Sequence, residues 1–245
     1  MLSVKVWCQT DVGLKRLNNE DSFLIDADLG LYLLADGMGG HSGGEVASNM
    51  AVQVVRDVIA ASYEKESGVN PYDLLNRSYS SASETIYNKS LIENNLKGMG
   101  TTLVAALIRD NKIYFANVGD SRAYLVRSTG VWQMTEDHSL VNEQIKAGVI
   151  KDEASGALSK NVITRSVGFE KSITCDIIER QMNDGDKYLV CTDGLTGMVN
   201  DRDIFEIIRK SEKDICVSEL INEAKNNGGL DNVTVMLIDV SSAEG

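Results

Sequence analysis

Short apolar runs closed by turn residues recur along most of this chain. Runs rich in β-branched and aromatic residues and bounded by glycine are typical of buried strands. The pattern predicts strands over 3–9, 22–27, 31–35, 102–108, 112–118, 121–127, 131–135, 173–180, 187–191 and 232–239. The close spacing of the runs between 102 and 135 favours an antiparallel meander.

Apolar positions at helical spacing predict two long helices and three shorter ones. The clearest stripe runs from Val46 to Ile59 with a 3.6-residue period. A second helix starts at Pro71, with Asn70 as its N-cap, and runs to about residue 95. The shorter helices are predicted over 139–147, 201–210 and 214–226. Because helices and strands do not alternate regularly, the pattern argues against a parallel Rossmann-type sheet and favours a layered α+β domain.

The remaining segment of note, about residues 148–168, is polar with a weak pattern, and we interpret it as a mobile excursion from the domain. The chain has one proline, no repeat and no Ser/Gly-rich linker. We therefore expect residues 1–245 to form a single domain.

Composition narrows the class of protein. A hydrophobic content of 43% is enough for a sizeable core. No apolar stretch is long enough to span a bilayer and the N-terminus lacks a signal-peptide core, so we expect a soluble, cytoplasmic protein that does not bind membranes. The net charge of -12 argues against nucleic acid as a partner and means that an anionic substrate needs local cations.

The four cysteines are scattered: Cys8, Cys175, Cys191 and Cys216. Buried free thiols are favoured over disulfides, because three of the four fall in apolar patterns. A structural zinc site is not expected, since the chain has no C-x-x-C spacing and only two histidines.

Four aspartates sit beside glycines at the edges of apolar runs: Asp36, Asp120, Asp193 and Asp231. Strand ends in one sheet system can converge, and converging carboxylates repel one another unless a cation lies between them. Hard divalent metals with oxygen ligands meet that need. Any one Asp-Gly pair alone is equally well explained as an ordinary turn.

Two polar clusters near the N-terminus add candidate chemistry. In the first, Arg16 offers a planar fork suited to phosphate, with Glu20 and Asp21 nearby, although a solvated turn explains the same residues. The second, residues 36–45, holds five glycines before the strongest helix, whose N-terminus favours anions. It lacks the Walker Gly-Lys-Ser/Thr ending. His41 is either a proton donor or a cap-region side chain.

Nine short blocks run in order across nearly the whole chain, among them D-G-M-G-G-H at 36–41, N-V-G-D-S-R at 117–122 and G-G-L-D-N-V-T at 228–234. The others lie at 16–21, 43–48, 100–102, 137–141, 163–168 and 192–196. With these blocks the chain resembles the metal-dependent Ser/Thr protein phosphatases (the PPM family), in particular the small stand-alone bacterial members. The resemblance implies a central antiparallel β-sandwich flanked by helices on both sides, a four-layer αββα fold.

The resemblance also implies a metal site. Asp36 would bridge two Mn2+ or Mg2+ ions, with the Gly37 carbonyl on one and Asp193 and Asp231 on the other. Glu20 would contact the first ion through water. Asp120, together with Asp193, would hold a third ion. Two bridged ions can turn water into hydroxide near neutral pH and stabilise an in-line displacement.

The remaining roles surround that site. Arg16 would grip the substrate phosphate, Asp21 would support the carboxylates, and Asn232 would orient the neighbourhood of Asp231. The excursion at 148–168 would be the family's flap, which contains Ser166.

The sequence leaves open which group acts as the general acid. Many eukaryotic members carry a histidine two residues after the bridging aspartate, but Met38 stands there and cannot donate a proton. His41 is the nearest candidate, and bound water is the alternative.

The function implied is hydrolysis of phosphoserine and phosphothreonine in proteins by a metal-activated water, opposing a Ser/Thr kinase, in a monomer. A cysteine phosphatase needs Cys-x5-Arg, which is absent, and Asp26-Ala27-Asp28 lacks the residue that an aspartyl-phosphate site requires at Gly30. A silent phosphoprotein-binding module would be favoured only if metal ligands were missing. A calcium-stabilised structural domain needs neither Arg16 nor a flap.

Overall fold

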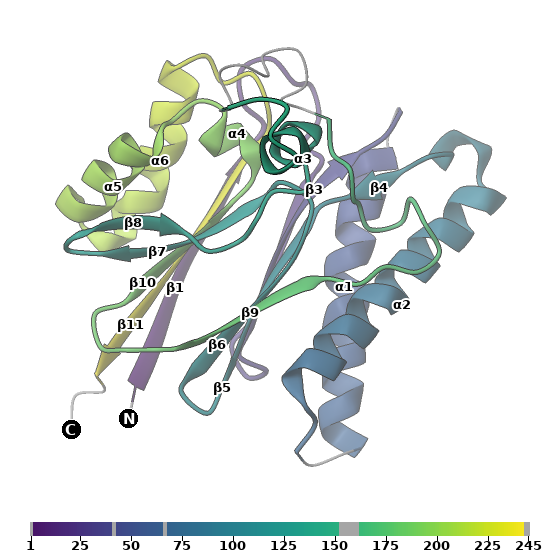
Figure 1. Cartoon of the computed structure of the whole chain (residues 1–245), viewed down its shortest axis with the longest axis horizontal. Helices are drawn as coiled ribbons and strands as arrows, with labels where there is room; N and C mark the ends of the chain where they lie inside the picture. The colour runs from purple at the N-terminus through teal and green to yellow at the C-terminus, as the bar shows by residue number, and fades with distance from the viewer. Residues whose placement is uncertain (1, 41–42, 66–67, 152–161, 243–245) are drawn as a thin grey trace.

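The computed structural model describes residues 2–40, 43–65, 68–151 and 162–242. Two antiparallel β-sheets face each other in the middle of the molecule, and helices cover the outer face of each sheet (Figure 1). The predicted four-layer αββα arrangement is therefore confirmed.

The first sheet contains the two ends of the described chain. Its strands lie in the order β1 (Leu2–Asp11), β11 (Val233–Ser242), β10 (Lys187–Cys191), β7 (Arg122–Arg127) and β8 (Gly130–Gln133). Over its whole length β1 pairs with β11, from Leu2 opposite Ser242 to Asp11 opposite Val233.

The second sheet is built from the middle of the chain. Its strands lie in the order β2 (Asp21–Asp26), β3 (Leu31–Met38), β5 (Leu103–Arg109), β6 (Lys112–Val118) and β9 (Asp176–Gln181), and the short β4 (Gly100–Thr101) pairs with the end of β3. A two-residue turn joins β5 to β6. Asp110 and Asn111 both have positive φ there, which is the backbone twist that tight hairpins require.

Helices form the outer layers. On the second sheet lie α1 (Gly43–Lys65) and α2 (Pro71–Ile92), which is followed by the 3-10 turn η1 (Asn94–Leu96). On the first sheet lie α4 (Asp193–Thr196), α5 (Asp201–Lys210) and α6 (Lys213–Asn226). The predicted cap of α2 is confirmed, since the Asn70 side chain accepts a hydrogen bond from the Tyr72 amide.

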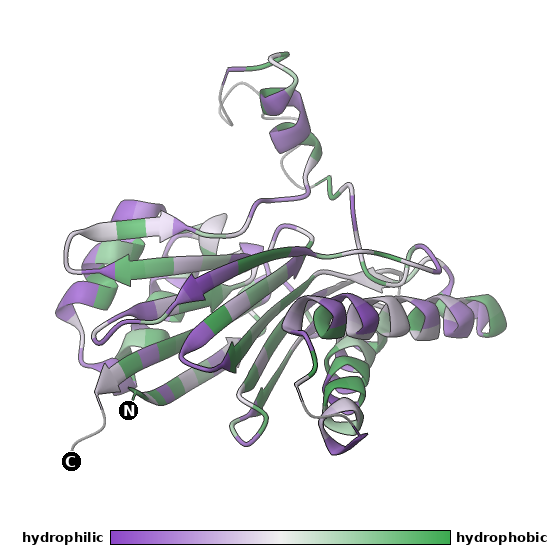
Figure 2. Ribbon diagram, turned by 60° about the horizontal axis from the view of Figure 1, so that its bottom comes forward, coloured by the Kyte–Doolittle hydropathy of each residue, from purple (hydrophilic) through white to green (hydrophobic). Residues whose placement is uncertain are grey.

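Three apolar clusters hold the layers together. One packs the second sheet against α1 and α2, and one packs the first sheet against α4, α5 and α6. The third fills the space between the sheets with side chains such as Phe115, Tyr188 and Met236. Phe115 and Tyr188 come from opposite sheets, and their ring centroids lie 5.5 Å apart. Hydrophobic colouring accordingly follows the sheets and the inward helix faces (Figure 2).

Most predicted elements are present, with local differences. The strand predicted to end at residue 35 continues to Met38, so Asp36 and Gly37 lie inside β3. The strand predicted from 173 starts at Asp176, and the short α4 and β4 were not predicted. All four cysteines are free, and three are buried. In the described part of the chain no helix has the length and apolar character needed to cross a membrane.

The predicted excursion lies beside α3 (Leu140–Lys146), which projects from the body of the sandwich (Figure 2). Residues 148–151 and 162–168 are described, whereas 152–161 lie outside the described residues. Its far end is fastened to the fold: the Val167 and Thr101 backbones exchange two hydrogen bonds, of 2.8 and 3.0 Å.

The packing between the two sheets can be tested by substituting two phenylalanines. We expect Phe115→Ala to lower the free energy of unfolding by about 3–5 kcal/mol, because it leaves a cavity in a fully buried cluster. Phe23→Ala is the matched control, since Phe23 is 39% exposed on β2 and its loss should cost much less. Urea unfolding of the metal-free protein measures both, and equal losses would contradict this packing.

Candidate active site

The aspartates among the predicted site residues gather where the two sheets end together. Asp21 on β2 lies directly opposite Asp36 on β3, so the two carboxylates share one face of the second sheet. From the first sheet, Asp193 follows β10 and Asp231 precedes β11, which are neighbouring strands. Asp120 lies in the short connection that carries the chain from β6 in one sheet to β7 in the other.

Two glycines let backbone segments approach one another at this point. A Cβ on Gly37 would lie 2.0 Å from the Gly44 carbonyl oxygen, and a Cβ on Gly194 would lie 1.8 Å from that of Asn232. Both distances are far below van der Waals contact, so no side chain fits. The glycine beside each aspartate thus brings β3 close to the start of α1 and brings α4 close to the Asp231 loop.

Asn232 ties the N-terminal loop to this cluster. Its side-chain oxygen accepts a hydrogen bond from the Glu20 amide at 2.8 Å. Its side-chain nitrogen donates to the carbonyls of Val12 and Asn18, both at 3.0 Å. One side chain therefore fixes the loop that carries Arg16 against the strand that follows Asp231.

Arg16 lies at the mouth of the cluster. Its guanidinium donates to Asp231 Oδ2 at 2.7 Å and lies 4.0 Å from Glu20 Oε2. The Arg16 side chain is 48% exposed, so an incoming anion can reach it from solvent.

Asp21 lies behind the site. Thr192 and Thr234 donate to its Oδ2 at 3.1 and 2.6 Å, which connects β2 to β11 and to the residue that follows β10. Its other oxygen is buried and accepts no hydrogen bond from the described residues. This placement agrees with a supporting role.

Burial and mutual repulsion hold these carboxyls toward their protonated forms. Burial raises the pKa of Asp120 to about 7, with further contributions from Asp193 and Asp137. Burial, Asp21 and Asp193 raise the pKa of Asp36 well above its ordinary range. The pKa of Asp193 is also raised, by burial and by Asp231. A cation beside these carboxylates would favour their ionised forms and so counteract the rise in all three pKa values.

The residues fit hard divalent ions. Among the described residues, Asp21, Asp120 and Asp193 each bury a carboxylate oxygen that receives no hydrogen bond. Buried acceptors of this kind are costly, and Mn2+ or Mg2+ would satisfy them. In the described ranges no three such side chains already surround one point as a finished ligand set. One of the predicted ligands, Asp231, instead forms an ion pair with Arg16 at 2.7 Å.

Two threonines that were not predicted as site residues hold the backbone of Asp36. The Asp36 amide donates to Thr102 Oγ1 at 2.9 Å, and its carbonyl accepts from Thr101 Oγ1 at 2.8 Å and from the Thr102 amide at 2.9 Å. Both threonines lie in the block at 100–102, which was recognised without roles for its members.

Of the two remaining predicted residues, the structure describes only Ser166. Ser166 lines a second cavity of about 650 Å3, together with Met38 and Phe169. It is not brought into the carboxylate cluster, although Met38 is two residues from Asp36. His41 lies outside the described residues.

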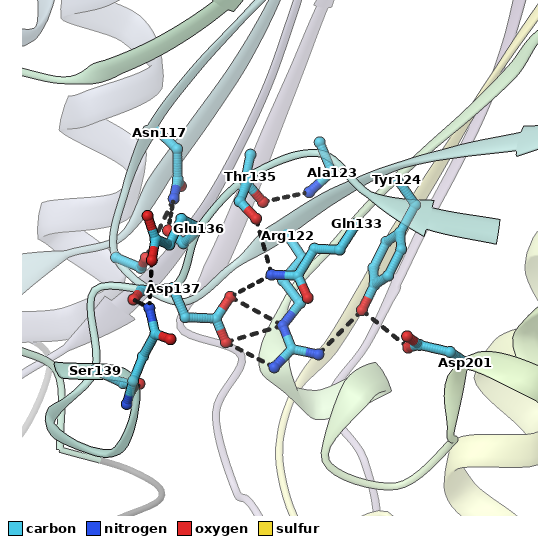
Figure 3. Close-up of polar contacts among 12 residues, drawn as sticks. Asn117, Arg122, Ala123, Tyr124, Gln133, Thr135, Glu136, Asp137, Ser139 and Asp201 are labelled. Carbon is cyan, nitrogen blue, oxygen red and sulfur yellow. Dashed lines mark hydrogen bonds and ion pairs between the residues drawn. The ribbon is translucent and has the colours of Figure 1, made fainter. Parts of the chain in front are cut away.

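A cavity of about 430 Å3 opens beside the cluster, lined by Asp120, Asp193 and Asp231. Residues of a polar network also line this cavity, and Figure 3 shows the contacts within that network. Arg122 binds the Asp137 carboxylate through Nε and NH2, with contacts of 2.6 to 3.0 Å. The sequence analysis did not assign these two residues, although both lie in blocks that it recognised.

Comparisons with known proteins agree with this geometry. The family model described as protein phosphatase 2C matches residues 13–233. The chain belongs to the protein phosphatase 2C family. This confirms the resemblance drawn from the nine blocks. Enzymes of this family dephosphorylate proteins and use Mn2+ or Mg2+.

Individual relatives of this phosphatase match along nearly their whole length. The chain is 37% identical over 239 residues to the serine/threonine phosphatase stp of Listeria monocytogenes serotype 4b, covering 94% of each chain. It superposes on the serine/threonine phosphatase PstP/Ppp of Mycobacterium tuberculosis with a TM-score of 0.89 and 33% identity, covering 98% of this chain and 99% of that one.

A second solved structure bears on the metal. It is the catalytic domain of PstP in complex with two manganese ions, with a TM-score of 0.87 and 33% identity. The superposition covers 99% of this chain and 100% of that chain. This phosphatase is therefore a metal-dependent enzyme that acts on phosphorylated proteins.

The raised carboxyl pKa values predict an unusual pH dependence of the metal-free protein. A carboxyl whose pKa is raised on folding binds its proton more tightly in the folded state. Such a group stabilises the fold at low pH and loses that effect as pH rises from about 4 to about 7. We therefore expect the EDTA-treated protein to unfold more easily at about pH 8 than at about pH 5.5, as measured by urea unfolding.

Asp120→Asn isolates one of these groups. The amide carries no charge at either pH, so the metal-free variant should be more stable than the unaltered protein at the higher pH and should depend less on pH. A variant with an unchanged pH profile would show that Asp120 does not carry the raised pKa.

Proposed function

We propose that this phosphatase hydrolyses phosphoserine and phosphothreonine esters through the cluster formed by Asp36, Asp120, Asp193 and Asp231, with Arg16 as the phosphate-binding residue. The observation that carries this assignment is the combination of buried carboxylate oxygens lacking donors with an accessible arginine at their edge. An acidic protein of net charge -12 can bind an anionic phosphoprotein only where cations and arginine reverse the local charge.

The chain's own residues have distinct tasks in this proposal. Asp36, together with the Gly37 carbonyl, would hold an ion on the second sheet, and Asp193 and Asp231 would hold another from the first sheet. Glu20 would act through water, and Asp120 with Asp193 would hold a third ion. When bound, the ions supply an activated water and neutralise the charge that develops during phosphoryl transfer.

Arg16 would take the phosphate. Its fork already reaches a carboxylate oxygen at 2.7 Å, and phosphate oxygens offer the same bidentate geometry. Asp21 and Asn232 would act indirectly, since they hold β2, the Arg16 loop and the Asp231 strand in register.

The cysteines support hydrolysis by water over a thiol nucleophile. Burial raises the pKa of Cys8 and Cys175 to about 12 and that of Cys216 to about 11, and it also raises the pKa of Cys191. A thiolate is the reactive form, so none of the four is suited to attack a phosphate ester near neutral pH.

The wider setting is also proposed. A Ser/Thr kinase of the same cell would supply the phosphorylated substrates, and the enzyme would act in the cytoplasm as a monomer. We propose further that residues 1–245 form one domain with a flap over about 148–168, in which Ser166 faces the second cavity.

The function is tested by phosphate release from a phosphothreonine peptide. We expect turnover with Mn2+, none with excess EDTA, and no effect of cysteine-directed reagents. Asp36→Asn should abolish turnover without unfolding the protein, because it removes charge from the centre of the ion site. A folded protein that binds Mn2+ but releases no phosphate would favour the silent phosphoprotein-binding module instead.

The general acid is tested at His41. If His41 protonates the leaving group, His41→Ala should slow hydrolysis of an alkyl phosphate by about 10^2–10^4-fold. The same variant should hydrolyse p-nitrophenyl phosphate nearly as fast as the unaltered enzyme, since that leaving group needs no proton. Equal losses on both substrates would contradict the role of His41 as general acid.

A further inference from the structure

His138 lies just before α3, away from the cluster that we assign to the ions. The residue is 8% exposed, and its ring is enclosed between the Gly119 turn and Asp176 at the start of β9. Neither the motif analysis nor the proposed reaction gives this side chain a role, although it lies in the recognised block at 137–141.

His138 forms two hydrogen bonds with the backbone of Gly119, one to its carbonyl group and one from its amide group. The His138 amide donates to the Gly119 carbonyl at 3.0 Å, and the Gly119 amide donates to Nδ1 of the His138 ring at 3.0 Å. Gly119 itself has a φ of 109°, and a Cβ there would lie 2.6 Å from the Thr102 side chain. The turn is therefore held by close packing on one side and by His138 on the other.

These hydrogen bonds determine which nitrogen of the neutral His138 ring carries the proton. Because Nδ1 accepts a hydrogen bond, the proton of the neutral ring is on Nε2, which donates to Asp176 Oδ2 at 3.1 Å. Arg165 NH1 also lies 2.8 Å from Nε2, but two donors cannot bond to each other. Arg165 instead donates to Asp176 Oδ1 at 2.8 Å, so it holds the carboxylate that orients the ring.

The two hydrogen bonds between His138 and Gly119, which we call the clamp, act directly on Asp120. The Gly119 carbonyl that accepts from His138 belongs to the peptide group whose nitrogen is that of Asp120. The Asp120 side chain is 7% exposed, and its Oδ1 receives no hydrogen bond from the described residues. Its position therefore depends on the backbone of this turn more than on partners of its own.

We propose that His138 is a positioning residue: through its Nδ1 bond to Gly119 it sets the place of the Asp120 carboxylate and so the affinity of the ion held there. The inference rests on the proposed role of Asp120 as a ligand of a third ion. Loss of the Nδ1 acceptor would leave a buried amide without a partner and let the turn shift. Partners one step behind a metal ligand typically change affinity by about 10- to 100-fold.

Two substitutions of His138 distinguish the hydrogen bond made by Nδ1 from the hydrogen bond made by Nε2. In His138→Asn the side-chain oxygen takes the place of Nδ1 and can accept from Gly119, whereas the link to Asp176 is lost. In His138→Gln the terminal amide takes the place of Nε2 and can reach Asp176, whereas no acceptor faces Gly119. The pair therefore distinguishes the Gly119 bond from general packing of the ring.

The measurement is calorimetric titration of the metal-free, full-length protein with Mn2+, with Asp120→Ala as the reference that lacks the third site. We expect His138→Asn to bind all ions like the unaltered protein. We expect His138→Gln to lower the affinity for the most weakly bound Mn2+ ion by about tenfold or more and to leave the affinities for the tighter ions unchanged. Equal behaviour of the two variants, or an unaltered protein with no ion that depends on Asp120, would overturn the proposal.

The readout does not depend on turnover. A protein that fails to hydrolyse the phosphothreonine peptide but shows this difference in Mn2+ binding contradicts the proposed function and supports the role of His138. Should His138→Gln not fold, nitrogen NMR of the unaltered protein decides, because an unprotonated Nδ1 supports the clamp and a protonated Nδ1 excludes it.

Discussion

The repulsion among carboxylates that two sheets bring to one place is the constraint on which the rest of this structure depends. Antiparallel pairing sets Asp21 opposite Asp36, and two adjacent strands of the other sheet deliver Asp193 and Asp231 to the same end. Such a cluster opposes its own folding unless protons, an arginine or metal ions reduce its charge. Arg16 pairs with Asp231, and burial and the neighbouring carboxylates raise the pKa of Asp36.

The scaffold around the cluster is correspondingly stiff. Asp36 is held through its backbone by Thr101 and Thr102, and Asn232 fixes two neighbouring segments with a single side chain. The apolar layers behind these residues are buried, so the proposed ligands lie within or next to well-packed strands. Rigid elements of this kind keep like charges close together where flexible loops would let them separate.

Much of this architecture could be predicted from the sequence. Strand and helix periodicity located the layers, because each element buries one face and its apolar spacing records that burial. The proposed ligand residues came from the resemblance, whose blocks span the chain. Side chain to backbone bonds between distant segments were not predictable in this way. His138 meets Gly119 and Thr102 meets Asp36 across long sequence separations, and such contacts leave no periodic trace.

The pairing of β1 with β11 also fixes where the outer ends of these two strands, Leu2 and Ser242, lie. Leu2 and Ser242 are neighbours, whereas Asp11 and Val233, at the other end of the same two strands, adjoin the Asp231 loop. Nine residue steps of extended chain separate these ends by about 30 Å. A label or surface attachment placed at Leu2 or at Ser242 would therefore be held at the end of this strand pair away from the carboxylate cluster, with the two attachment points side by side (Figure 1).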